Sequence, residues 1–214
     1  LMISNVSLIG AGEELTIIDA QETSRVITME DCDNNIISDL TLTGGLAEGE
    51  YPDIYGGGMY LINSHPILND VTISENIAHN GGGIHLEDSS EPTMINSIIW
   101  GNSPNPISYN WNYNDAGVIS YGDIEGGFEG EGNIDSDPLF TDSDNGDYTL
   151  QPSSPCIDAG DPSCEDPDGS ICDMGAYPYF HEADNCIDLH EGNNLISFST
   201  LPIHGLSDMP ECIY

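Results

Sequence analysis

The sequence predicts an all-β solenoid in which short coils of chain stack on one another. The segment GGGMYLINSHPILNDVTISEN begins at Gly56 and returns as GGGIHLEDSSEPTMINSIIWGN, which begins 25 residues later at Gly81. Similarity at this period is typical of solenoids, because one unit is too small to bury its apolar face alone. The 24 Gly and 13 Pro in 214 residues favour many turns over long helices.

The strands of the coils are predicted from alternating side chains. The segments SDLTLTGG (from residue 38), NDVTISEN (from 69) and NSIIWGN (from 96) align, and residues two apart share one side of a strand. Three columns are expected to face the core: Ile37, Leu68 and Met94; Leu40, Val71 and Ser97; Leu42, Ile73 and Ile99. Thr41, Thr72 and Ile98 fall between these columns, so we expect them to face outward.

Other columns mark the corners of the coils. Asp39, Asp70 and Asn96 align, and Asp and Asn tolerate the left-handed backbone that a tight corner requires. Four glycines are expected to serve the same end where a new strand begins: Gly57, Gly58, Gly82 and Gly83. Asn76 and Asn102 end their coils and are predicted to stack their side-chain amides.

Two groups of aromatic residues are candidates for ligand binding. Between Asp39 and Asp70 the spacing stretches to 31 residues, so LAEGEYPDIY (46–55), with Tyr51 and Tyr55, is predicted to be a loop inserted in one coil. Insertions on solenoids commonly carry binding residues. In ISYNWNY the rings of Tyr109, Trp111 and Tyr113 would share one side of an extended strand, where they could stack on sugar rings or cover the last coil.

The C-terminal third of the chain changes in composition. Residues 135–180 are rich in turn residues, and the Asn145-Gly146 pair predicts a hairpin between PLFTD and DYTLQ. From His181 the composition changes again. We therefore expect a β-solenoid over 1–134, a cap over 135–180, and a linker with the truncated start of a surface or secretion module over 181–214.

Six cysteines without a CxxC spacing favour disulfides over a zinc site, and disulfides indicate an oxidising compartment. Cys164 and Cys172 flank the turn-rich EDPDGSI and are the best local pair. Cys186 with Cys212 is a second predicted pair, and Cys32, amid the repeats, is expected to be a buried free thiol.

The charge of the chain excludes some partners. It carries 38 Asp and Glu against a single basic residue, Arg25. Without cations to displace their counterions, nucleic acids and anionic membrane surfaces are excluded as partners. Bound Ca²⁺ would relieve the self-repulsion, although the charge could equally serve solubility. Seven carboxylates in turn-rich segments are the candidate ligands, with a role in turns as the alternative: Asp135, Asp137, Asp142, Asp144, Asp147, Asp166 and Asp168.

These residues resemble a known family. The coils resemble the right-handed parallel β-helix repeats of secreted bacterial proteins, and GNIDSDPLF, NGDYTLQPSSPCIDAGDP and PDGSICDMGAY are similar to the segment that ends many such helices. This resemblance implies three parallel sheets wound around a narrow apolar core. We therefore expect a right-handed parallel β-helix of about five coils that ends in an irregular disulfide-containing cap. The GGG and IxxN elements also resemble the GGAI and FxxN repeats of polymorphic outer-membrane adhesins, with Ile in place of Phe and Gly in place of Ala.

Enzymes with this fold act mostly on polysaccharides, but the motifs for such chemistry are absent. A pectate-lyase-like mechanism would need Arg25 as its base, with no lysine to assist it. Hydrolysis needs paired carboxylates, for which Asp31, Glu87 and Asp88 are candidates. The motifs of the polygalacturonases are missing, and the histidines have no paired metal spacing. His85 aligns with Tyr60 of the preceding coil, so we expect it to belong to an outer row of side chains at the surface.

We therefore expect a non-catalytic, extracellular or cell-surface β-helix with a structural or adhesive role, which requires no cofactor. Because the chain begins in mid-repeat, its unpaired strand edges predict self-association end to end into filaments, promoted by Ca²⁺ or salt. The alternative is a carbohydrate-binding or polysaccharide-degrading protein that uses Tyr51 and Tyr55 or the row from Tyr109 to Tyr113, with glycans as its partners.

Overall fold

The computed structural model describes residues 1–11, 16–110 and 117–181. The chain divides into two units, Leu1–Phe180 and His181–Tyr214, and the first is described below. It is an all-β structure, as predicted, and its larger sheets are parallel. Among the described residues the helical structure is one 3-10 turn, Ser143–Asn145.

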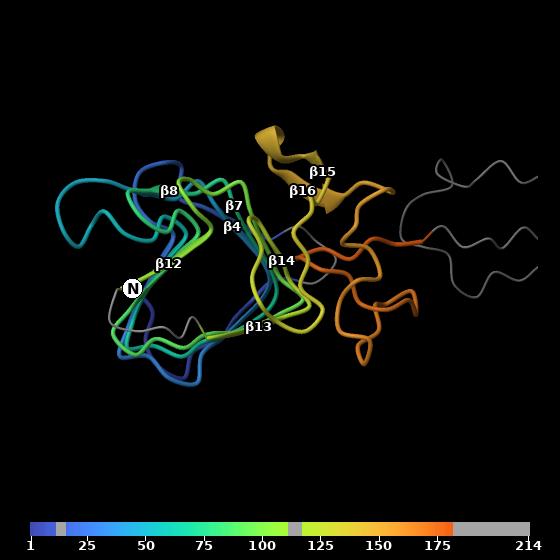
Figure 1. Ribbon diagram of the computed structural model, residues 1–214, viewed down its shortest axis with the longest axis horizontal. Coiled ribbons are helices and arrows are strands. Elements are labelled where there is room, and N and C mark those ends of the chain that lie inside the picture. Colours follow the sequence, from blue (N-terminus) through green and yellow to red (C-terminus); the bar gives the residue numbers. More distant parts are fainter. Residues whose placement is uncertain (12–15, 111–116, 182–214) are drawn as a thin grey trace, which may run out of the picture. The chain divides into compact units, whose positions relative to one another are not determined.

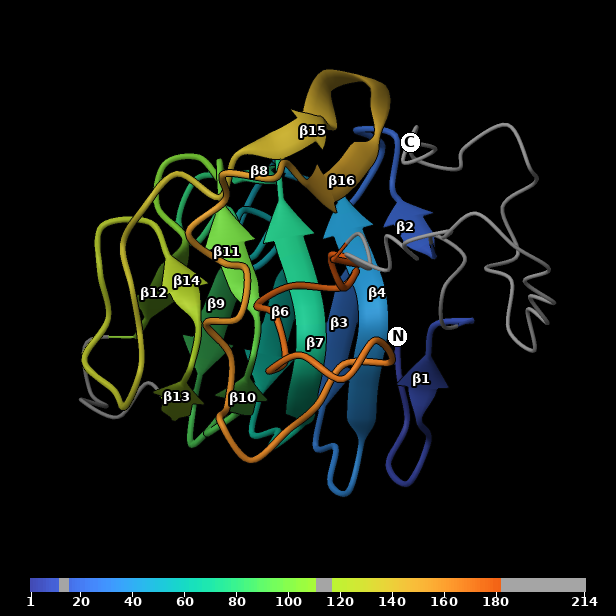
Figure 2. The ribbon, with the colours of Figure 1, turned by 90° about the vertical axis from the view of Figure 1, so that its right-hand side faces the viewer.

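The largest sheet contains eight strands, which pair in parallel. Its central strands are β4 (Ile36–Thr43) and β7 (Ile67–Ser74). The others are β1 (Leu8–Ile9), β2 (Ile17–Asp19), β10 (Thr93–Ile95), β11 (Ile98–Trp100), β13 (Val118–Ser120) and β14 (Asp123–Ile124). Figure 2 shows β1, β4, β7, β10 and β13 running in the same direction.

A second parallel sheet has the order β12-β9-β6-β3. Its strands are β3 (Ile27–Glu30), β6 (Met59–Ile62), β9 (Ile84–Glu87) and β12 (Ile107–Tyr109). A short parallel pair joins β5 (Leu46–Ala47) to β8 (Ile77–Ala78), and the predicted hairpin is the antiparallel pair β15 (Phe140–Asp142) and β16 (Asp147–Leu150). In all three parallel sheets, neighbouring strands come from successive repeats of the sequence.

The predicted core columns are confirmed. Leu68 pairs with Ile37 on one side and with Met94 on the other, and all three side chains are at most 1 % exposed. Leu42 pairs with Ile73, which pairs with Ile99. The apolar cluster that contains them also takes side chains from the four-stranded sheet, so it lies between the two sheets. Figure 1 shows β12 and the pair β4 and β7 on different sides of this core.

The corner columns are confirmed for the acidic and amide residues. Asp39, Asp70 and Asn96 have φ values of 57°, 54° and 48°, in the left-handed region. The side-chain amide of Asn76 donates to Oδ1 of Asn102 over 3.0 Å, and its own Oδ1 accepts from the backbone N–H of the preceding repeat. Buried amides of this kind satisfy the backbone groups at the ends of the strands.

The role predicted for four glycines is wrong. Gly56 and Gly81 have the positive φ, not Gly57, Gly58, Gly82 or Gly83. The latter lie against a neighbouring repeat: a Cβ at Gly82 would lie 2.3 Å from the carbonyl oxygen of Ser103. Glycine is therefore required at these four positions, because two backbones approach so closely there that no side chain fits.

The outward columns of the large sheet do not reach solvent. Thr41, Thr72 and Ile98 are outside the core cluster but are 0 % exposed, because residues from the 135–180 segment cover the sheet. Thr72 Oγ1 accepts from the Ala176 N–H over 3.0 Å. Figure 2 shows this segment, in orange, crossing in front of β4 and β7.

The cysteines agree with the predictions as far as the described residues extend. Cys164 and Cys172 form a disulfide with a Cα–Cα distance of 5.4 Å, and Cys32 is a buried free thiol. Cys156 is also free and buried. The predicted pair Cys186 and Cys212 lies outside the described residues.

Candidate functional site

The inserted loop makes a pocket with the outer side of the four-stranded sheet, which we call the aromatic pocket. It has a volume of about 210 Å³. Eight residues line it: Tyr51, Tyr55, Asn80, His85, Glu87, Ser108, Tyr109 and Asn110. The two tyrosines of the loop and Tyr109, which are far apart in the sequence, therefore meet in one place.

The alternation of the strands determines which side chains face this pocket. Met59, Leu61, Ile84 and Leu86 belong to the core, so the residues between and after them face outward. Tyr60 pairs with His85, as the alignment predicted. His85 pairs in turn with Ser108, which makes an outer row across three strands.

Tyr55 of the loop covers this outer row. Its ring stacks on the His85 ring at 4.2 Å between centroids and 7° between planes, and Tyr51 packs edge-on against Tyr55. His85 was expected at the surface, but it is only 5 % exposed. Burial lowers the pKa of His85 to about 4, so the ring is neutral at neutral pH. Its Nδ1 lies 2.6 Å from the Ser108 hydroxyl.

Glu87 is the acidic group of the aromatic pocket. Its Oε1 accepts from the Tyr51 hydroxyl over 2.9 Å, and its Oε2 accepts from the Tyr60 hydroxyl. Burial and this hydrogen bond raise the pKa of Tyr60. The two phenols hold a carboxylate that is only 8 % exposed in a fixed position. A carboxylate has about four acceptor positions, so two remain for a ligand.

Arg25 holds the loop from the other side. Its guanidinium carbon lies 4.7 Å from the centre of the Tyr60 ring, and one nitrogen donates to the Pro52 carbonyl over 3.0 Å. Asp53 lies 4.0 Å away. Partial burial lowers the pKa of Arg25. The basic residue considered as a lyase base is therefore engaged in fixing the loop.

The predicted row of three rings is described only in part. Tyr109 lines the aromatic pocket and is 50 % exposed, and Tyr51 is 66 % exposed. Trp111 and Tyr113 lie outside the described residues.

The predicted carboxylate group is not brought together in this pocket. Glu87 lines it, whereas Asp31 and Asp88 do not. Asp31 instead accepts from the Asn63 side-chain amide over 2.7 Å, and both Asp31 and Asp88 have positive φ. Both therefore occupy corner positions after their strands.

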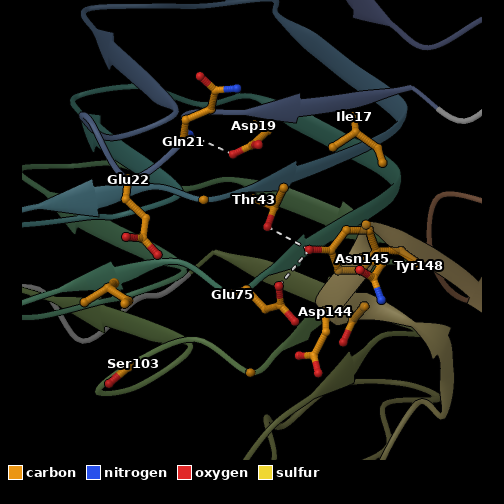
Figure 3. A pocket seen from close by; sticks show the side chains of 15 residues that line it. Ile17, Asp19, Gln21, Glu22, Thr43, Glu75, Ser103, Asp144, Asn145 and Tyr148 are labelled. Carbon is orange, nitrogen blue, oxygen red and sulfur yellow. Dashed lines mark hydrogen bonds between the residues drawn. The ribbon is translucent and has the colours of Figure 1, made fainter.

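A larger cavity of about 790 Å³ lies beside the β15–β16 hairpin. Figure 3 shows Tyr148 of the hairpin pointing toward Thr43 and Glu75. Its hydroxyl lies 2.8 Å from the Thr43 hydroxyl and donates to Glu75 over 3.0 Å. The carboxylates of Asp19, Glu22, Glu75 and Asp144 make the lining acidic.

Five of the seven candidate calcium ligands accept hydrogen bonds from the backbone of nearby residues. Asp135 accepts from the Gly126 N–H, Asp137 from Leu139, Asp147 from Thr149, Asp166 from Asp173, and Asp168 from Ser170. Asp142 accepts from the Asn145 side chain, and Asp144 lines the larger cavity. Within the described ranges, no group of three or more His, Cys, Asp or Glu is placed to hold a metal ion. These contacts agree with the alternative role in turns.

Some residues of the aromatic pocket were not predicted as ligand-binding residues. Asn80, Ser108 and Asn110 carry no motif, and His85 was assigned to an outer row only. The alignment of Tyr60 with His85 could have predicted that both side chains lie on the same outer side of the sheet. The direction in which the inserted loop folds has no signal in the repeat.

Comparison with known proteins identified no relatives. No family model, curated protein or solved structure matches the chain. Among the described residues, no helix is long and apolar enough to cross a membrane.

Proposed function

We propose that this chain is an extracellular, non-catalytic adhesive protein that binds glycans in the aromatic pocket. The observation that carries this proposal is the meeting of Tyr51, Tyr55 and Tyr109 around Glu87. Exposed aromatic rings offer flat apolar surface to a sugar ring. Polar groups of Asn80, Ser108 and Asn110 surround the rings and can bond to hydroxyl groups.

The proposal includes a closed right-handed parallel β-helix of about five coils. It is supported by the three parallel sheets, in which strands of successive repeats pair in register. An extracellular location is supported by the Cys164–Cys172 disulfide, since disulfides persist in oxidising compartments.

Binding is favoured over hydrolysis because of the groups in the pocket. Glycoside hydrolysis commonly uses two carboxylates across the scissile bond. Glu87 is the one carboxylate among the described residues that line the aromatic pocket. It is also held by two tyrosine hydroxyls, which suits a fixed hydrogen-bond acceptor.

The test is a glycan array probed with the wild-type chain and with two alanine variants. Tyr55→Ala removes the ring that stacks on His85, and Tyr109→Ala removes an exposed ring of the pocket. We expect each to weaken binding of the array hits about tenfold. Phe180→Ala is the matched control, because that ring is 46 % exposed and does not line the pocket.

An array without hits would overturn the proposal. Hits whose affinity is the same in Tyr55→Ala and Tyr109→Ala would locate binding elsewhere and would also overturn it. Self-association with Ca²⁺ or salt stays a separate prediction, and light scattering with and without Ca²⁺ tests it. A monomer under all conditions would contradict that prediction.

A further inference from the structure

The charge around the aromatic pocket restricts the ligands that it can accept. Glu87 supplies its one carboxylate among the described residues, and His85 is neutral at neutral pH because burial lowers its pKa to about 4. Arg25, the single basic residue of the sequence, does not line the pocket. It packs on Tyr60 and bonds to Pro52 beneath the loop. An anionic sugar would therefore meet the Glu87 carboxylate inside the pocket. The one cation nearby, Arg25, packs on Tyr60 and is already engaged by Asp53 and the Pro52 carbonyl.

The same groups attract a positive charge. Tyrosine rings favour a cation that lies against them, and a carboxylate at the base of a ring cluster adds a charge-assisted hydrogen bond. Tyr51 touches both elements, since its ring packs against Tyr55 while its hydroxyl bonds to Glu87. The net charge of −37 also raises the concentration of cations around the chain.

The size of the pocket limits the ligand to a small unit. Pockets for drug-sized ligands have volumes of about 300–1,000 Å³. The aromatic pocket, at about 210 Å³, suits one small ring. Asn80, Ser108 and Asn110 add neutral hydrogen-bonding groups, which match hydroxyls better than a bare alkyl chain.

We propose that the aromatic pocket selects a hexosamine residue whose free amine is protonated, with its ammonium group bonded to Glu87. This inference rests on the proposed glycan-binding function and names its ligand class. A neutral hexose would fill the same space without the ionic contact. An N-acetylated residue would lose the charge and carry extra bulk next to Glu87.

The experiment compares three β-1,4-linked tetramers that differ at carbon 2: the glucosamine, N-acetylglucosamine and glucose oligomers. Calorimetry at mildly acidic pH, where the amine is protonated, measures each affinity for the wild-type chain. We expect the glucosamine oligomer to bind at least about tenfold more tightly than the glucose oligomer. This preference should shrink at high salt, because the contact is ionic.

Glu87→Gln tests the ionic contact directly. Glutamine keeps the shape, and its oxygen and amide nitrogen can each bond to one tyrosine hydroxyl, so the preference for the glucosamine oligomer over the glucose oligomer should disappear. Glu129→Gln is the matched control, because it removes one exposed acidic charge outside the pocket. Circular dichroism establishes whether Glu87→Gln folds, and the wild-type comparison decides the question if it does not.

The outcomes separate this inference from the proposed function. If the three oligomers bind equally and Tyr55→Ala weakens them all, the glycan pocket stands and the selection of an amine is overturned. If no oligomer binds and the glycan array has no hits, both fail. A short lysine-containing peptide is the last probe. If it binds as tightly as the glucosamine oligomer, the pocket recognises an ammonium group alone, which overturns the assignment to a sugar.

Discussion

Two segments cover the outward side chains of the parallel sheets. Residues 135–180 cover part of the large sheet, and the inserted loop 46–55 covers part of the four-stranded sheet. Under the first, Thr72, Ile98 and Asp123 are all 0 % exposed. Under the second, Tyr60, His85 and Glu87 are also buried, at 2 %, 5 % and 8 % exposed. Tyr51 of the loop itself and Tyr109 beside it remain 66 % and 50 % exposed. Both segments therefore exclude water from the side chains beneath them, but only the loop leaves exposed rings around a pocket.

The difference lies in what each segment brings to its sheet. The cap contributes Leu150, Cys156 and Met174 to a cluster with Ile98. The loop contributes two tyrosines and a few polar contacts, and it has one cation, Arg25, to hold it. Apolar burial stabilises the fold in proportion to its area, while loosely held polar segments open at low cost in free energy. We therefore expect the cap to contribute mainly to the stability of the fold and the loop mainly to ligand binding.

The largest effect is expected at the cap. Ile98→Ala should lower the free energy of unfolding by about 3 kcal/mol, because it leaves a cavity in the fully buried cluster under the cap. Urea unfolding followed by circular dichroism measures this change. Ile67→Ala is the control, since that side chain is 44 % exposed and should cost less than about 1 kcal/mol. Equal effects of the two changes would show that the cap adds little stability.

The second largest effect is expected at the buried Asp123, which makes the free energy of unfolding depend on pH. Burial raises the pKa of Asp123 from 3.8 to about 6, although the Ser136 N–H and the Cys156 thiol donate to its carboxylate. A raised folded-state pKa means that the protonated form is favoured in the fold. Protonated Asp123 therefore makes its full contribution to the stability of the fold below about pH 4, and this contribution is lost as the pH rises through about 6.

Asp123→Asn should remove that part of the pH dependence. Asparagine keeps the shape and can still accept from Ser136, so the variant should be about 2 kcal/mol more stable than wild type above pH 6 and equal to it near pH 4. Urea unfolding across this pH range is the measurement, with the exposed Asp144→Asn as the control for net charge. Some dependence should remain, because the pKa of Asp70 is also raised, to about 7. Parallel profiles for the two variants would contradict the prediction.

The repeat predicted the parts of the molecule in which each unit contacts its neighbour. One local geometry is copied along the chain. From it follow the pairing of Leu68 with Ile37 and Met94, the left-handed corner at Asp70 and the hydrogen bond from Asn76. The Cys164–Cys172 disulfide was predictable for a similar reason, because its two cysteines flank one turn.

The sequence did not predict the contacts that do not recur from one repeat to the next. Thr72 and Ile98 looked like surface residues because the residues that cover them lie far along the chain, from Leu150, 52 residues after Ile98, to Ala176, 104 residues after Thr72, and have no repeat of their own. The meeting of Tyr51 and Tyr55 with Tyr109 in one pocket was not predicted for the same reason. Tyr51 and Tyr109 each form part of a plausible binding group, but the fold of loop 46–55 over β9 depends on Arg25 and Glu87, which lie in other repeats.

The smallest effect on global stability is expected at Arg25. Arg25→Gln removes the cation on Tyr60 and weakens the bond to Pro52, at a cost of about 1 kcal/mol or less. The local effect should be larger. Hydrogen exchange should accelerate at the amides of Asp53 and Tyr55, which bond within the loop, but not in β4 or β7.

Arg25→Lys separates the charge from the shape of the guanidinium. Lysine keeps the charge but lacks the planar fork that reaches ring and carbonyl together, so exchange in the loop should be intermediate. Unchanged exchange in both variants would mean that Tyr55 and Tyr51 hold the loop by themselves. In the expected case, faster exchange in the loop should accompany weaker glycan binding, because the tyrosines that close the pocket are carried on a segment that Arg25 keeps in place.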